Sequence, residues 1–233
     1  MTDLAVKWVR RHTLNVRISH WINLIAVGYL LVSGVHIFLD FPELYWGKTG
    51  FRGYPAAFRL EDLGISWDQA AKWGNRRWGR NYHYTFGWVF VINGLVYVGW
   101  SLYRRHFRRS MLHGQTSPDT AESSSAASVS VPSQAESPSP RYGTPQRFAY
   151  LGMIFVVTPL LFLTGIAQMP AFTAIAPWLI DMFGGRQTAR TIHTITTVGV
   201  VLFVLMHVGQ VIAAGPIKKV RGMVTGRVPI MAE

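Results

Sequence analysis

Residues 190–211 read RTIHTITTVGVVLFVLMHVGQV, and this stretch decides the fold of the chain. About 20 apolar residues, at roughly 1.5 Å each, cross a hydrocarbon core of about 30 Å. The stretch nevertheless carries two histidines, His193 and His207. Their separation is close to four helical turns, so both imidazoles lie on one face, about 21 Å apart along the axis. One imidazole is therefore expected near each membrane surface.

Three more windows of similar length lack charged residues, at residues 18–39, 84–103 and 148–169. Together with residues 191–214, they predict an all-α integral membrane protein, a bundle of four transmembrane helices. The basic start and first apolar run resemble a signal peptide. That run is longer than a secretory core region and lacks a small-residue cleavage site, so we expect a retained first helix.

Composition divides the chain into three segments. Residues 1–109 hold the first two predicted helices. They are joined by an extracytoplasmic loop between Asp40 and Asn81 that contains four tryptophans and is called the aromatic loop here. Residues 110–147 are rich in Ser, Pro, Ala and Glu, which predicts a disordered cytoplasmic linker. Residues 148–233 hold the last two helices and a basic tail. The aromatic loop is expected to fold against the membrane surface or against a partner protein.

The net charge of +12 does not indicate a nucleic-acid partner, because Lys and Arg gather at the ends of the apolar windows. Four alternating crossings place 14 of the 23 Lys and Arg residues on the side of the termini. This excess favours cytoplasmic termini. The chain has no cysteine, so any iron must be held by His or Met.

Topology pairs four histidines by depth. With the N-terminus inside, His20 lies near the cytoplasmic surface, where His207 also lies, while His83 shares the outer depth with His193. Ionisable residues within a membrane are costly, and imidazole is a common ligand of heme iron. The two pairs therefore predict two stacked hemes in the bundle. His36 also lies at the outer depth and is an alternative ligand there.

An arginine stands three residues before three of these histidines, at Arg17, Arg80 and Arg190. Residues at this spacing share a helix face, so each guanidinium is placed to pair with a heme propionate. The alternative is that these arginines anchor helix ends at the membrane surface.

Two pairs of short segments resemble each other across the halves of the chain. LVSGVHIF (residues 31–38) is similar to FLTGIAQM (residues 162–169), and LVYVGW (residues 95–100) to LMHVGQ (residues 205–210). The matches indicate a faint internal duplication, in which the first window resembles the third and the second resembles the fourth.

Four motifs stand out together: Arg17-x-x-His20-Trp21, Ser33-Gly34, His83, and the spacing from His193 to His207. In these motifs the chain resembles the bacterial four-helix di-heme cytochrome b subunits that accompany nickel-iron hydrogenases, formate dehydrogenases and thiosulfate reductases. The resemblance covers nearly the whole chain outside the Ser/Pro-rich linker.

The resemblance implies two heme b groups with two axial histidines each, in a bacterial inner membrane. It also implies electron transfer between an oxidoreductase at the outer face and quinone, an exchangeable partner. The tryptophan-rich loop is most similar to the thiosulfate-reductase type, which implies a periplasmic molybdenum-containing oxidoreductase. We expect the quinone near His20 and Asn23, which are polar residues on an apolar helix.

Two other interpretations stay open. One is a stand-alone membrane enzyme that oxidises superoxide and reduces quinone, since Arg76, Arg77 and Arg80 form a basic approach to the outer site. The other is a non-heme transporter or structural anchor that uses its histidines for proton relay or packing.

Overall fold

The computed structural model describes residues 6–10, 12–103, 148–149 and 151–231. The predicted linker at residues 110–147 and the basic end of the second helix lie outside the described residues. Within them, three helices are long and apolar enough to cross a membrane. These are α1 (Leu14–Asp40), α3 (Arg76–Tyr103) and α8 (Arg186–Ala213).

The third apolar window forms a shorter helix than predicted. A π-helical turn, Met153–Val157, leads into α5 (Thr158–Ile166). Pro159 has no N–H to donate to the preceding turn, and the Thr158 hydroxyl donates to Met153 O at 2.8 Å. The chain then turns into α6 (Pro170–Ile175) and α7 (Trp178–Met182), so this helix ends three residues before the predicted boundary.

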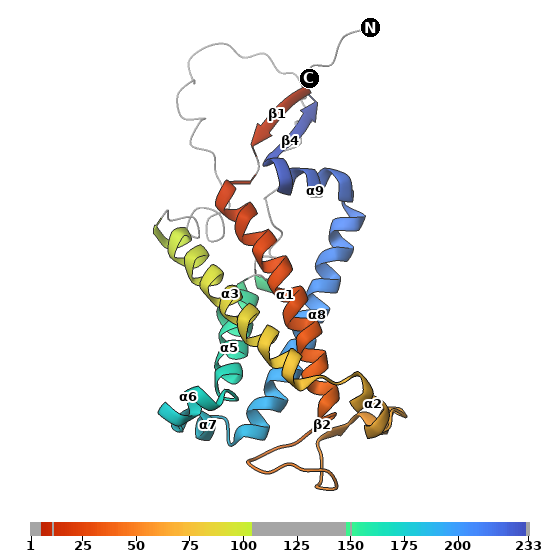
Figure 1. Cartoon of the computed structure of the whole chain (residues 1–233). Coiled ribbons are helices and arrows are strands. Elements are labelled where there is room, and N and C mark those ends of the chain that lie inside the picture. The colour runs from red at the N-terminus through yellow and green to blue at the C-terminus, as the bar shows by residue number, and fades with distance from the viewer. Residues whose placement is uncertain (1–5, 11, 104–147, 150, 232–233) are drawn as a thin grey trace, which may run out of the picture.

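The three long helices and α5 pack as two hairpins, α1 along α3 and α5 along α8 (Figure 1). Small and polar residues bring α1 and α3 together. A Cβ added to the buried Gly79 would lie 2.9 Å from Ser33 O. Asn93 Nδ2 donates to Ser19 O at 3.1 Å and to Asn23 Oδ1 at 2.8 Å, which satisfies polar groups inside an apolar bundle.

The second helices of the two hairpins share their length and the positions of their arginines and of one histidine. Both α3 and α8 have 28 residues. Each has arginine at its first and fifth positions and histidine at its eighth: Arg76, Arg80 and His83 in α3, and Arg186, Arg190 and His193 in α8. The duplication suggested by short sequence matches therefore extends to helix length and register.

The two ends of the bundle carry different structures (Figure 1). At one end, here called the inner end after the predicted cytoplasmic side, β1 (Val6–Arg10) pairs antiparallel with β4 (Arg227–Met231), next to α9 (Pro216–Thr225). At the outer end lie β2 (Glu43–Leu44), β3 (Phe58–Arg59), a 3₁₀ turn (Leu60–Leu63) and α2 (Trp67–Trp73). Both terminal strands thus lie at one end and the aromatic loop at the other.

Candidate cofactor site

The outer pair, His83 and His193, joins the two hairpins. The centres of the two imidazole rings lie 6.0 Å apart, with an angle of 66° between the ring planes. A metal–imidazole bond is about 2 Å, and a ring centre lies about 1 Å beyond its nitrogen, so two imidazoles on opposite sides of one ion have centres about 6 Å apart. The observed distance between the ring centres agrees with this value.

A hydroxyl and a glycine from the neighbouring helix hold each ring of the outer pair. His83 Nδ1 lies 3.1 Å from Ser33 Oγ, and His193 Nδ1 lies 3.0 Å from Thr164 Oγ1. The glycine that follows each hydroxyl residue lies against the same ring. An added Cβ would lie 3.5 Å from the His83 ring at Gly34 and 3.4 Å from the His193 ring at Gly165. Thr164 was not predicted as a site residue, although Thr164-Gly165 matches Ser33-Gly34 in the two similar segments.

The inner pair, His20 and His207, has nearly the same spacing in different surroundings. The ring centres lie 6.2 Å apart, with an angle of 65° between the planes. Phe203 stacks on His207 with an angle of 8°, and Trp21 contacts His20 edge-on at 5.7 Å. Within the described residues, neither ring of this pair makes a hydrogen bond. Aromatic side chains therefore contact the inner pair, whereas hydroxyls contact the outer pair.

The donor set fits a heme better than a bare metal ion. Two imidazoles supply only two ligands, and the described residues contain no group of three or more His, Cys, Asp or Glu side chains placed to hold a metal. A metal that brings its own equatorial nitrogen ligands needs only two axial donors from the protein. A cavity of about 390 Å³, lined by His83, His193, Gly34 and Gly165, lies at the outer pair.

The three arginines that precede histidines have different surroundings. Arg80 and Arg190 line the outer cavity together with Arg76 and Arg186. Arg190 also donates to two backbone carbonyls next to it, Glu43 O at 2.8 Å and Phe41 O at 2.5 Å. Arg17 instead donates to two backbone carbonyls at the end of α9, and its Nε lies 3.1 Å from Met223 O. The structure therefore brings Arg80 and Arg190, but not Arg17, to a histidine-lined cavity.

The structure does not bring His36 to the outer pair. His36 Nδ1 lies 2.7 Å from Trp73 O, and its ring contacts Trp78 edge-on at 5.1 Å. The side chain thus fastens the aromatic loop to α1. Asn23, expected near a quinone, accepts the hydrogen bond from Asn93 already described.

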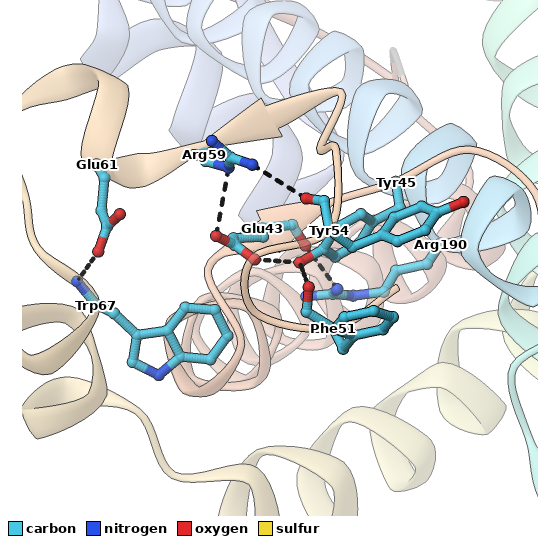
Figure 2. Close-up of polar contacts among 8 residues, drawn as sticks. All are labelled: Glu43, Tyr45, Phe51, Tyr54, Arg59, Glu61, Trp67 and Arg190. Atoms are coloured by element: carbon cyan, nitrogen blue, oxygen red, sulfur yellow. Dashed lines mark hydrogen bonds and ion pairs between the residues drawn. The ribbon is translucent and has the colours of Figure 1, made fainter. Parts of the chain in front are cut away.

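The aromatic loop packs over the outer end around a buried acid (Figure 2). Glu43 is 3% exposed and lies 3.5 Å from Arg59 Nε, while the fully buried Tyr45 donates its hydroxyl to the Glu43 carboxylate. Burial and this carboxylate raise the pKa of Tyr45 above its usual range. Thr191 Oγ1 donates to Tyr45 O at 2.6 Å, which links the loop to α8. Sequence patterns had not singled out Glu43.

Paired imidazoles between apolar helices are typical of membrane cytochromes of the b type. A family model described as prokaryotic cytochrome b561 matches residues 11–226, so the chain belongs to this family. It is a membrane heme protein of electron transport, as the resemblance predicted. The family favours heme binding over the non-heme transporter or anchor.

The chain is also similar to YedZ1 from Azospira oryzae, which carries the name of a protein-methionine-sulfoxide reductase subunit. The two are 24% identical over 197 residues, which cover 84% of this chain and 87% of YedZ1. No solved structure matches this chain.

Proposed function

We propose that the chain is a membrane-anchoring di-heme cytochrome b subunit with four transmembrane helices and cytoplasmic termini in a bacterial inner membrane. It passes electrons between a periplasmic oxidoreductase and the quinone pool. The observation that carries the proposal is the presence of two imidazole pairs, with ring centres 6.0 Å and 6.2 Å apart, near opposite ends of α8. His83 and His193 would hold an outer heme b, and His20 and His207 an inner heme b.

The protein's main contribution is to fix the two sites relative to each other. When bound, heme supplies one-electron redox chemistry. The helix α8 contributes one ligand to each site, and the rise of a helix sets their separation at about 21 Å along its axis. Arg80 and Arg190 line the outer cavity, so their positive charge would pair with the carboxylates of a heme bound there.

The outer end offers a surface for the redox partner. Trp46, Phe51 and Trp73 each expose more than half of their area there. Exposed aromatic groups of this kind are enriched in protein interfaces. The name of YedZ1, a reductase subunit, supports assembly with an oxidoreductase, which we propose to be molybdenum-containing.

The inner end offers a site for quinone. A groove of about 390 Å³ runs along α1 and is lined by Ile18, Trp21, Ile22 and Ile25. Trp21 contacts the ring of His20, so the groove lies next to the inner pair. Apolar walls suit a quinone, and the remaining apolar faces of α1, α3 and α8 would contact membrane lipid.

The test is to count hemes in the detergent-purified chain by a pyridine hemochrome assay, with reduced-minus-oxidised spectra. We expect two heme b groups per chain in the wild type and both to remain in His36→Ala, the matched control. A single heme in the wild type, or loss of a heme in His36→Ala, would contradict the assignment.

The arginine-lined outer cavity also favours a second candidate, a stand-alone superoxide:quinone oxidoreductase, because cationic walls attract small anions. The discriminating assay measures superoxide consumption by the heme-loaded chain with quinone and no other protein. We expect the background rate from the electron-transfer subunit. A rate above background that Arg80→Gln lowers would favour the second candidate.

A further inference from the structure

Each outer imidazole contacts one buried hydroxyl that comes from a helix carrying no outer ligand. Ser33 on α1 contacts His83, and Thr164 on α5 contacts His193. Both hydroxyl residues are fully buried. Because the two contacts occupy equivalent places in the two hairpins, the outer pair is held symmetrically.

The hydrogen-bond partners of the hydroxyls determine where each imidazole carries its proton. Ser33 Oγ lies 2.6 Å from Tyr29 O, and Thr164 Oγ1 lies 2.7 Å from Leu160 O. A carbonyl can only accept, so each hydroxyl donates its single hydrogen to the backbone. The hydroxyl oxygen then accepts from Nδ1–H of the facing ring. Nδ1 therefore carries the proton, and the lone pair of Nε2 is left for a metal.

We propose that Ser33 and Thr164 are positioning residues that hold both outer ligands in the Nε2-ligating tautomer and lower the reduction potential of the outer heme. The inference rests on the outer heme of the proposed function. An acceptor at Nδ1 makes the imidazole a more basic ligand, which stabilises oxidised iron. Removing the acceptor leaves the buried N–H of His83 or His193 with only the backbone carbonyl of Leu30 or Leu161, a weaker arrangement that favours the reduced heme.

The equivalent hydrogen bonds in the two hairpins predict the relative shifts of the reduction potential. One hydrogen bond to each axial ligand predicts similar effects for Ser33→Ala and Thr164→Val, and a larger effect when both are combined. The inner heme, whose ligands have no such contact among the described residues, should keep its potential.

The experiment is a spectroscopic redox titration of the heme-loaded full chain in lipid nanodiscs. Thr164→Val removes the hydroxyl and keeps the side-chain shape, whereas Thr164→Ser keeps the hydroxyl. The matched control is Thr196→Val, because the Thr196 hydroxyl donates to Ile192 O at 2.7 Å on a membrane helix and makes no hydrogen bond to an imidazole of the described residues. The outer heme is identified as the one missing from His193→Ala.

In Thr164→Val we expect the ratio of reduced to oxidised outer heme, at a fixed applied potential, to rise about fivefold. Thr164→Ser and Thr196→Val should match the wild type. Loss of the outer heme alone from Thr164→Val, with both controls loaded, would support the same role. Wild-type potentials in Thr164→Val, or an equal shift in Thr196→Val, would overturn the inference. A wild-type chain without heme would instead refute the proposed function.

Discussion

The outer and inner histidine pairs have nearly equal spacing but are built differently. The outer histidines occupy the same position of α3 and α8, and each contacts a hydroxyl and a glycine of its own hairpin. The inner histidines come from α1 and α8, and Tyr97 of α3 stands at the position that His207 occupies in α8. The comparison shows that a duplicated hairpin provides one symmetric site, whereas the second site depends on residues without a histidine counterpart.

The largest expected effect separates the two pairs. Replacing His193 or His83 with Ala should remove the outer heme and leave the inner one, because a single imidazole remains. Replacing His207 or His20 should do the opposite. Heme content and reduced-minus-oxidised spectra of the purified variants measure both outcomes. Loss of both hemes from every variant, with the fold retained, would show that the sites are not independent.

The next effect concerns the space beside the outer rings. Gly165→Leu should lower outer heme occupancy roughly tenfold, because a Cβ there already lies 3.4 Å from the His193 ring and further atoms must displace it. Gly28→Leu is the matched control, since a Cβ at Gly28 has no neighbour within 4 Å. Hemochrome assays at limiting heme compare the two. Equal occupancy in both variants would show that the glycine does not shape the site.

A smaller effect concerns the loop that covers only the outer end. Because the pKa of Tyr45 is raised from 10.0 in the folded loop, the stability that its proton supplies is complete below pH 10.0. This stability is lost as the pH rises through the folded-state pKa. Tyr45→Phe should weaken the loop by about 1 kcal/mol near neutral pH and remove this alkaline loss.

Protection of residues 41–59 from proteolysis, measured as a function of pH, tests the role of Tyr45. Tyr54→Phe is the control, because Tyr54 is exposed and its hydroxyl makes no hydrogen bond to Glu43 within the described residues. The alkaline loss should persist in this variant. If it persisted equally in Tyr45→Phe, another group would control the loop.

The smallest effect distinguishes the arginines. Arg80 lines the outer cavity and is exposed, so Arg80→Gln should lower the ratio of reduced to oxidised outer heme about twofold. Arg17→Gln should instead loosen α9 and leave the outer heme unchanged, because Arg17 binds the carbonyls of α9. Redox titration of both variants provides the measurement. A larger shift in the inner heme of Arg17→Gln would show that Arg17 also acts on a heme.

Sequence reasoning predicted the long helices and the depths of four histidines, and the structure brings His20 to His207 and His83 to His193. Their ligation of iron stays a prediction. The contacts of His36 and Arg17 were not predictable, because each depends on a segment distant in sequence, the aromatic loop for one and α9 for the other.

The sequence alone predicted which histidines lie at matching heights along the bundle, because a continuous apolar helix has a fixed rise and a fixed angular step per residue. It also indicated the duplication, through motifs repeated at matching helix positions. The tertiary structure decided what faces each ring, namely hydroxyl and glycine at the outer pair and aromatic side chains at the inner pair. Those contacts depend on how two hairpins rotate and pack against each other, and side chains from all the packed helices set that arrangement together.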